Sequence, residues 1–290
     1  MSGGDDEHGH CAAEAHGRGR GEAAPALLAA RHRCCRRRGP ATRAAGAGGA
    51  PVSSRPRAVI LAGGKGTRLA PYTATFPKPL VPIGDMPILE VVVRQLKRHA
   101  VEHVTLTVNH LASLLQAYFG NGEKFGLDID YSLEDRPLGT AGPLALLDGL
   151  DSTFLVLNGD LLTDLDYSQM LEQHRARSAI MTVGVYERVH TVDFGVVETD
   201  DAQCISGYTE KPSLRYLVSM GVYVMEPSVL EWIEPGEHLD LPTLVNRLIE
   251  GGVPVHTFHH RGYWLDIGRP DDYQQAQADF PQLKERLLGS

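Results

Sequence analysis

Apolar and polar positions in the first part of the chain body follow two different periods, which predict alternating strands and helices. Continuous apolar runs are typical of buried strands, whereas apolar residues three and four positions apart are typical of helices lying on a sheet. This order favours right-handed βαβ units and a mostly parallel sheet, with an edge strand where residues alternate between apolar and polar, at 127–133. Strands are expected at 58–61, 104–108, 127–133 and 154–157, and helices at 87–96, 112–119 and 167–177.

The second part of the pattern contains more strands than helices. A late apolar stretch at 263–267 carries one aspartate, Asp266. Taken together, the two parts predict the α/β fold class, as one Rossmann-like, three-layer domain with a mostly parallel central sheet. Strands are expected here at 180–186, 195–198, 205–208, 220–225 and 255–259, and helices at 228–233, 241–250 and 271–280.

Residues 1–56 lack a sustained apolar period and consist largely of Ala, Gly and Arg. Such a segment buries too little apolar surface to offset its ordering entropy, so we expect a disordered low-complexity tail followed by one domain at 57–290. A start codon assigned too early would also explain the tail. Residues 1–57 hold ten Arg and five acidic residues, whereas the remainder holds 18 basic and 31 acidic residues. An acidic body is a poor nonspecific binder of nucleic acid, so no nucleic-acid partner is expected.

The cysteine, histidine and hydropathy patterns indicate in which cellular compartment the protein is expected. Three of the four cysteines lie in the tail near His8, His10, His16 and His32, but no ligand spacing of a zinc module is present. The fourth is Cys204, and no disulfide framework is implied, which fits a reducing cytoplasm. No stretch approaches the roughly 20 apolar residues of a membrane span, so no membrane partner is expected.

A glycine-rich basic loop follows the first predicted strand. Gly63, Gly64 and Gly66 would let backbone N–H groups approach a phosphate at the carboxyl edge of the sheet, where ligands bind in open α/β folds. Arg68 and Lys78 add positive charge to the same region. The alternative interpretation is a purely structural turn, because the loop has neither the ending of a Walker loop nor the G-x-G-x-x-G spacing of a dinucleotide site.

The string from 63 to 80 reads G-G-x-G-T-R-L-x-P-x-T and then Pro-Lys-Pro-Leu, and it resembles the signature of the sugar-1-phosphate nucleotidyltransferases. The resemblance covers residues 57 to about 280 and implies a nucleotidyltransferase domain whose partners are a nucleoside triphosphate (NTP) and a sugar-1-phosphate. It assigns Arg68 and Lys78 as catalytic residues that stabilise the departing pyrophosphate. The residues that it assigns to nucleotide binding are Leu61, Ala62, Gly63, Gly64, Gly66, Thr67, Asn109, Gly139 and Thr140.

A second glycine turn, Gly139–Gly142, begins a predicted helix. From propensity alone, Thr140 is interpreted as the N-cap of that helix. The resemblance instead implies that this turn lies against the nucleobase and the sugar. The sequence of this segment, Gly-Thr-Ala-Gly-Pro-Leu-Ala-Leu, is most similar to that of the guanylyltransferases that act on mannose-1-phosphate. This resemblance implies a GDP-mannose-type product.

Two aspartates are candidate metal ligands. Asp160 follows Asn158–Gly159, a dipeptide that often marks a hairpin, but the next residues do not alternate like a partner strand. We therefore expect Asp160 at the open edge of the sheet, where a carboxylate opposite a triphosphate would repel it unless Mg²⁺ lay between them. Asp266 lies in an apolar stretch, where an isolated carboxylate needs a cation or several donors. The resemblance pairs Asp160 with Asp266 as catalytic Mg²⁺ ligands.

The assignments around the sugar rest on the resemblance. Glu210 would accept hydrogen bonds from sugar hydroxyls and Lys211 would hold the sugar phosphate, although Glu-Lys-Pro at a strand end is also a common surface turn. The sequence departs from the family at Phe194, where Tyr is usual, and at Ser219–Met220, where Asn-Ala is common. Because of both departures, the sequence does not determine which sugar is bound. The residues assigned to the sugar phosphate are Gly142, Gly195, Glu210, Lys211 and Gly221.

The leading hypothesis is an enzyme that forms a nucleotide-sugar and releases pyrophosphate. Positioning and charge neutralisation suffice for this transfer, in agreement with the absence of a Ser/His/Asp or Cys/His constellation from the sequence. The alternative is a regulatory subunit that binds a nucleotide-sugar without catalysis, although such a chain need not retain both aspartates, Arg68 and Lys78. A dinucleotide-binding oxidoreductase is excluded by the loop spacing and by Asn109, which stands where an acidic residue should follow the second strand.

Within the enzyme class, thymidylyl-, uridylyl- and cytidylyltransferases remain rivals to a guanylyltransferase. Many relatives continue into hexapeptide repeats that form a β-helix, and this sequence has no such period, so we expect a short, single-domain form. The oligomeric state stays open and includes a homo-oligomer.

Overall fold

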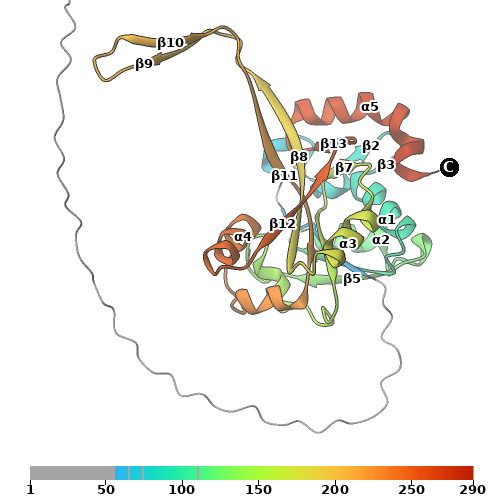
Figure 1. The fold of residues 1–290 in the computed structure, drawn as a ribbon. Coiled ribbons are helices and arrows are strands. Elements are labelled where there is room, and N and C mark those ends of the chain that lie inside the picture. Colours follow the sequence, from blue (N-terminus) through green and yellow to red (C-terminus); the bar gives the residue numbers. More distant parts are fainter. Residues whose placement is uncertain (1–55, 65, 74, 110, 290) are drawn as a thin grey trace, which may run out of the picture. The chain divides into compact units, whose positions relative to one another are not determined.

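The computed structural model describes residues 56–64, 66–73, 75–109 and 111–289, which form a seven-stranded central sheet (Figure 1). The strand order is β12-β8-β11-β6-β1-β4-β5. The predicted disordered tail falls outside the described residues and stays a prediction. In the order of the sheet, the strands span Val255–His260, Met181–Thr191, Ser213–Met225, Phe154–Asn158, Arg57–Leu61, His103–Val108 and Asp128–Leu133.

The sheet is mostly parallel, as predicted. β1 pairs in parallel with both β4 and β6, β4 pairs in parallel with β5, and β12 pairs in parallel with β8. Of the seven strands, β11 runs against its neighbours β6 and β8. β5 lies at an edge of the sheet, which confirms the position inferred from its alternating residues. The carboxyl ends of β1, β4 and β6 meet at one edge, with Leu61 beside Thr107 and Asn158.

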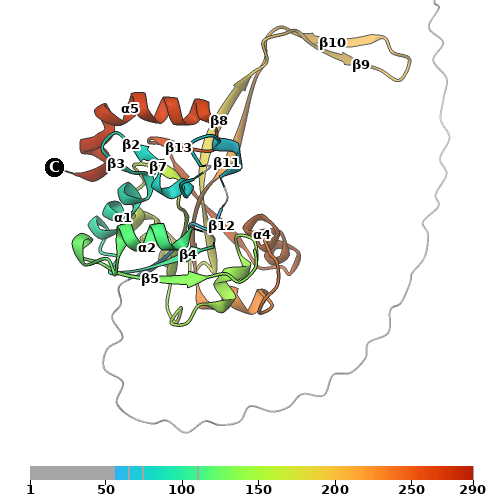
Figure 2. The same cartoon turned by 180° about the vertical axis from the view of Figure 1, so that it is seen from behind.

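Helices cover both faces of the sheet and give the predicted three-layer, Rossmann-like α/β arrangement (Figure 2). Successive strand residues point to opposite faces, so Ala58 and Ile60 of β1 pack in one core and Val59 packs in the other. All three are fully buried, which explains the continuous apolar run. Burial of a Val or Ile side chain contributes roughly 1.5–3 kcal/mol. The first core contains α1 (Ile88–Arg98), α2 (Ala112–Phe119) and α3 (Tyr167–Ala176), and the second contains α4 (Leu241–Glu250).

The last helix, α5 (Pro270–Leu288), is longer than predicted. The sequence predicts an end near Phe280, because Pro281 lacks the N–H that a helix interior needs. The helix continues because Phe280 and Leu287 are both buried in a third apolar core with Ile83. Packing of these side chains outweighs the local effect of the proline. Two short ribbons lie nearby, β2 (Pro82–Ile83) with β3 (Met86–Pro87) and β7 (Leu161–Thr163) with β13 (Trp264–Asp266).

β8 and β11 continue beyond the sheet and carry a two-stranded ribbon, β9 (Val196–Thr199) and β10 (Ile205–Thr209), as Figure 1 shows. β11 pairs with β6 from Val222 onwards, whereas its pairing with β8 begins at Ser213. We call residues 187–219 the arm; it leaves the sheet at the carboxyl edge of β6. The sequence predicts β8 and β11 too short, because the exposed arm residues contain no buried apolar run.

Thr140 does not cap the helix that follows it, so that prediction is wrong. The following element is a short 3₁₀ helix, Gly142–Leu146, whose N-cap is Ala141. The hydroxyl oxygen of Thr140 instead accepts a hydrogen bond from the N–H of Leu241 at 2.8 Å, at the start of α4. Threonine has the expected capping chemistry, but the helix that it serves begins 101 residues further along the chain.

The other helices follow the sequence closely, with one difference in type. The bounds of α2 and α4 match the predicted ones, while the helix expected at 228–233 is a 3₁₀ helix, Pro227–Trp232. The sequence favours solvated positions for His256, His259 and His260, and for His260 this prediction is wrong. Its side chain is 8% exposed, and its Nε2 lies 3.0 Å from Oδ1 of Asp164. Within the described part of the chain, no helix has both the length and the apolar character needed to cross a membrane.

Candidate active site

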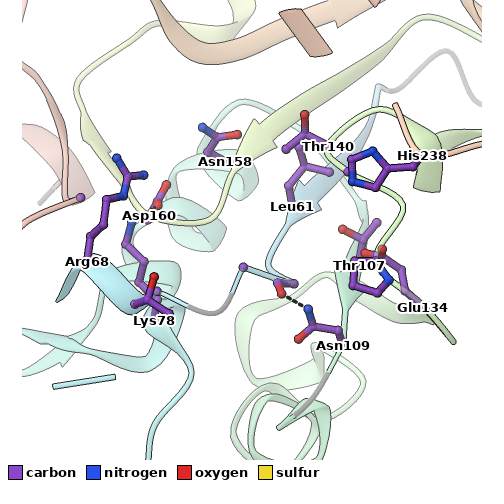
Figure 3. Close-up of a pocket in the computed structure, with 17 residues that line it drawn as sticks. Leu61, Arg68, Lys78, Thr107, Asn109, Glu134, Thr140, Asn158, Asp160 and His238 are labelled. Atoms are coloured by element: carbon purple, nitrogen blue, oxygen red, sulfur yellow. Dashed lines mark hydrogen bonds and ion pairs between the residues drawn. The ribbon is translucent and has the colours of Figure 1, made fainter. Parts of the chain in front are cut away.

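A cavity of about 520 Å³ lies at the carboxyl ends of β1, β4 and β6 (Figure 3). Its polar side chains form two groups on either side of Leu61. Such a cavity suits an elongated ligand that is charged at one end and forms hydrogen bonds at the other. The charged group contains Arg68, Lys78 and Asp160, the opposite group contains Thr107, Asn109, Glu134, Thr140 and His238, and the other lining residues are Leu61, Gly63, Gly64, Gly66, Thr67, Pro137, Gly139, Asn158 and Gly268.

The loop after β1 is held by hydrogen bonds to two of its carbonyl groups. The hydroxyl of Thr73 donates to the carbonyl of Gly66 at 2.7 Å, and the side-chain amide of Asn109 donates to the carbonyl of Gly63. Gly66 has φ 62°, and a Cβ there would lie 3.0 Å from Thr73 Cγ2 and 3.1 Å from Lys78 Cβ. Both the backbone conformation and the close approach therefore require glycine at this position.

An ion pair between Lys78 and Asp160 forms the charged end of the cavity. Lys78 begins the 3₁₀ helix Lys78–Leu80 and is only 9% exposed, so its charge needs a partner to replace water. Asp160 follows β6 after Gly159, whose N–H donates to the carbonyl of Leu61 at 3.1 Å. This contact turns the chain after β6 towards the glycine loop and brings the carboxylate of Asp160 to Lys78.

Asp266 comes from a distant part of the chain and lies near Asp160, Lys78 and Arg68, although it does not line the cavity itself. The antiparallel pairing of β13 with β7 places Asp266 opposite Leu161. The N–H of Ile267 donates to the carbonyl of Asp160 at 3.1 Å. The two aspartates that the sequence singled out therefore lie next to each other across two short paired strands.

The electrostatics of this end fit a bound cation. Burial raises the pKa of Asp266, the charge of Asp160 raises it further, and Lys78 and Arg68 lower it. Oδ1 of Asp160 is buried and has no hydrogen-bond partner among the described residues. Two neighbouring carboxylates with an unsatisfied oxygen suit Mg²⁺, which is usually held by one or two carboxylates together with substrate phosphates. The described residues contain no group of three or more His, Cys, Asp or Glu that could hold a metal ion.

The opposite end of the cavity contains residues that the sequence did not assign, above all Glu134 and His238. Glu134 follows β5, and its Oε2 accepts a hydrogen bond from the N–H of Leu138 at 3.0 Å. Burial raises the pKa of Glu134, whereas the Leu138 N–H and the charge of His238 lower it. The position of Glu134 directly after a predicted strand is a signal that could have identified it. His238 lies in a loop without any such signal, and Thr107, Pro137, Asn158 and Gly268 were also not assigned.

Most of the predicted nucleotide-binding residues line the cavity. Gly139, with φ 78°, lies so close to the carbonyl of Leu239 that a Cβ would approach it to 2.5 Å. Ala62 is buried and does not line the cavity. The predicted residues that do line it are Leu61, Gly63, Gly64, Gly66, Thr67, Asn109, Gly139 and Thr140.

The predicted sugar-phosphate residues do not line the cavity. Gly142 and Gly221 lie just behind it: the N–H of Gly142 donates to the carbonyl of Leu239 at 3.0 Å, and a Cβ on Gly221 would meet the lining residue Asn158.

The other three sugar-phosphate residues, Gly195, Glu210 and Lys211, lie in the arm, where the hydroxyl of Tyr208 donates to Glu210 at 3.1 Å. At about 3.3 Å per strand residue, the start of β11 at Ser213 lies on the order of 25 Å along the strand from Gly221, and Lys211 precedes that start by two residues. In this conformation the arm therefore holds these residues away from the cavity.

A mostly parallel α/β sheet with a glycine-rich loop and a polar cavity at its carboxyl edge defines a nucleotide-binding class of protein. The chain belongs to the nucleotidyl transferase family, whose model matches residues 57–282.

Curated relatives and solved structures agree with this family. The chain is 36% identical over 240 residues to a UTP–glucose-1-phosphate uridylyltransferase of Synechocystis sp., covering 76% of this chain and 62% of the relative. It is 34% identical over 230 residues to a mannose-1-phosphate guanylyltransferase of Mycobacterium tuberculosis, covering 77% of this chain and 64% of the relative. The chain thus spans about three fifths of the length of these relatives.

Solved structures show the same fold. A putative glucose-1-phosphate thymidylyltransferase from Bacillus anthracis, in complex with a sucrose, has a TM-score of 0.62 and 25% identity, covering 77% of this chain and 94% of that chain. HddC from Yersinia pseudotuberculosis has a TM-score of 0.60 and 26% identity, covering 77% of this chain and 99% of that chain.

Proposed function

We propose that the chain is a sugar-1-phosphate nucleotidyltransferase, which transfers a nucleoside monophosphate from an NTP to a sugar-1-phosphate and releases pyrophosphate. The observation that carries this proposal is the meeting of Lys78, Asp160 and Asp266 at the carboxyl edge of the sheet, beside the glycine loop. Phosphoryl-type transfers are catalysed mainly by positioning and charge neutralisation, which these groups can supply. Family membership and the names of the relatives support the same reaction.

The charged end of the cavity would hold the triphosphate. The N–H groups of Gly64, Gly66 and Thr67 would bind the phosphate oxygens, because the glycines let the backbone approach them closely. An oxygen of the sugar phosphate attacks the α-phosphorus, and the bond from that phosphorus to the β-bridging oxygen breaks. Arg68 and Lys78 would stabilise the negative charge that the departing pyrophosphate gains.

Asp160 and Asp266 would hold Mg²⁺. When bound, this ion neutralises charge on the α-phosphate. The unsatisfied, buried Oδ1 of Asp160 supports this assignment, since such an oxygen is unfavourable without a cation or a donor.

Glu134 supports guanine as the base. Its Oε2 already accepts from the N–H of Leu138, while its Oε1 lies near Gly63 in the cavity wall. A carboxylate suits the guanine edge, which presents a ring N–H next to an amino group. Uracil and thymine present their ring N–H between two carbonyl oxygens, which would repel a carboxylate. A GDP-mannose-type product is therefore the specific reaction that we propose.

The sugar phosphate would be bound by residues of the arm. Glu210 would accept hydrogen bonds from sugar hydroxyls and Lys211 would pair with the phosphate. Because Lys211 lies far along the arm, this role requires the arm to move towards the cavity mouth. Lys211 has φ 45°, a left-handed conformation that is unfavourable for a side chain and is concentrated at functional positions.

A uridylyltransferase is the second candidate. Its support is the Synechocystis relative, which has the higher identity, 36% against 34% for the M. tuberculosis guanylyltransferase. In either case one domain at 57–290 would carry the activity. The exposed free thiol of Cys204 is compatible with a reducing cytoplasm as its compartment.

The test is a pyrophosphate-release assay on the full chain with Mg²⁺. Each of five NTPs is combined with each member of a panel of sugar-1-phosphates. We expect the fastest release with GTP and mannose-1-phosphate. Fastest release with UTP and glucose-1-phosphate would select the second candidate. No release with any pair, despite measurable binding of a nucleotide-sugar, would replace the proposal with a non-catalytic binding subunit.

A further inference from the structure

The backbone around His238 is held on both sides, and its exposed side chain lines the cavity. The N–H of Leu239 donates to the carbonyl of Leu138 at 2.9 Å, and the carbonyl of Leu239 accepts from Ala141 at 2.8 Å. Glu237 is fixed by Arg247, with contacts of 2.6 and 3.0 Å. The imidazole between these anchors lines the cavity, and neither of its nitrogens has a hydrogen-bond partner among the described residues (Figure 3).

An exposed ring on a fixed backbone, at the wall of a polar cavity and with its nitrogens free of hydrogen bonds to the described part of the chain, is available to a ligand. His238 lies at the same end of the cavity as Glu134, on a separate segment of the wall. The two side chains offer complementary chemistry: the carboxylate of Glu134 accepts hydrogen bonds, and an imidazole N–H donates one. Thr140 lies beside His238 at this end, but its hydroxyl is already engaged with Leu241 and Asp240.

We infer that His238 is a specificity-determining residue that donates a hydrogen bond to the O6 carbonyl of a guanine base, while Glu134 accepts from the N–H groups of the same base. The inference rests on the proposed function and deepens it by naming the residue that reads the carbonyl. Guanine has an acceptor oxygen beside its donor edge, so a donor and an acceptor on two walls match it. Adenine carries an amino group in place of O6 and would meet the N–H of His238 with another donor.

The experiment compares two nucleotides, of which only one has the O6 oxygen that His238 would contact. Binding of GTP and of 2-aminopurine riboside triphosphate is measured by calorimetry on the full chain with Mg²⁺. The analogue keeps the 2-amino group but lacks both O6 and the N1–H, so the effect of each variant is compared with the wild type for the same nucleotide. The variants are His238→Ala, His238→Gln, whose amide keeps an N–H donor, and His259→Ala as a control on an exposed histidine of β12. The melting temperature of each variant is recorded to confirm folding.

We expect His238→Ala to weaken GTP binding about tenfold, as for loss of one hydrogen bond, and to change binding of the analogue by less than about twofold. His238→Gln should retain GTP binding to within about threefold, and His259→Ala should match the wild type. In turnover assays, His238→Ala should raise KM for GTP and leave kcat unchanged, because the base contact is the same in ground and transition states.

An equal loss for both nucleotides would show a structural role and overturn the inference, as would no loss for either. A wild-type preference for UTP over GTP would overturn it too, while leaving the proposed transferase reaction intact. Failure of the proposed function gives a different result, because the wild type would then release no pyrophosphate with any NTP.

Discussion

Lys78 and Asp160 form an ion pair although 82 residues separate them in sequence. Their side chains are 10% and 20% exposed. Removal of one partner from such a pair leaves an uncompensated charge with little water around it, which is strongly unfavourable. The pair exists because β1 and β6 are neighbours in the sheet, so the segments that follow them meet at one edge.

Asp160→Asn should lower kcat by about 10² to 10³, because it removes a charge that acts mainly in the transition state. The amide keeps the shape of the carboxylate but leaves the charge of Lys78 without its partner, so the variant should be less stable than the wild type while staying folded at the assay temperature. Asp151→Asn is the matched control, since Asp151 is exposed before the start of β6. Turnover is measured at saturating substrates, with circular dichroism as a check on folding. Turnover of Asp160→Asn within about twofold of the wild type would reject Asp160 as a catalytic group.

Gly66→Ala should lower the free energy of unfolding by roughly 1–2 kcal/mol, because alanine is unfavourable in the left-handed region. The new Cβ would also crowd Thr73 and Lys78. Gly64→Ala is the matched control, since a Cβ there would meet no atom within 4 Å. Urea denaturation of both variants measures the difference. Equal stability of the two variants would mean that the loop relaxes and does not require glycine at 66.

Thr140→Val should destabilise the fold by about 1 kcal/mol, because it removes the acceptor that caps the first turn of α4. Thr209→Val serves as the control, since Thr209 lies on the exposed ribbon of the arm. Thermal unfolding of the two variants is the measurement. A melting temperature of Thr140→Val equal to that of the control would show that the contact with Leu241 contributes nothing to stability.

Lys211→Ala should raise KM for the sugar-1-phosphate at least about tenfold and leave KM for the NTP unchanged, since a lysine–phosphate contact is lost only on the sugar side. Lys124→Ala removes an exposed lysine that packs over Tyr118, and it controls for the change in net charge. Steady-state kinetics with each substrate varied in turn separates the two constants. Unchanged constants for Lys211→Ala would mean that the arm does not reach the substrate.

Much of the fold could be read from the sequence because its signals are local. The run 58–61 is apolar on both sides, since a central parallel strand is covered on both faces, and this pattern identified β1. The bounds of α2 and α4 also followed from their apolar spacing. The full lengths of α5 and β11 did not follow, because α5 is extended by packing of Leu287 and β11 by pairing with β8 outside the core.

Site residues could be predicted from the sequence where one continuous stretch contains the motif. They could not be predicted where segments distant in sequence meet in the fold. The loop from Gly63 to Lys78 is such a stretch. The cost of burying a carboxylate indicated that Asp266 needs a partner. Only the family resemblance identified Asp160 as that partner. Glu134 and His238 enter the cavity through tertiary contacts of their loops, which no periodicity records.

The most direct test of the central claim follows the fate of labelled phosphorus. The full chain is incubated with Mg²⁺, mannose-1-phosphate and GTP labelled either at the α- or at the γ-phosphate, and the products are separated. We predict that the α label appears in GDP-mannose and the γ label in pyrophosphate. Transfer of the γ label to the sugar, or retention of both labels in GTP with every sugar phosphate and NTP tried, would contradict nucleotidyl transfer at this site.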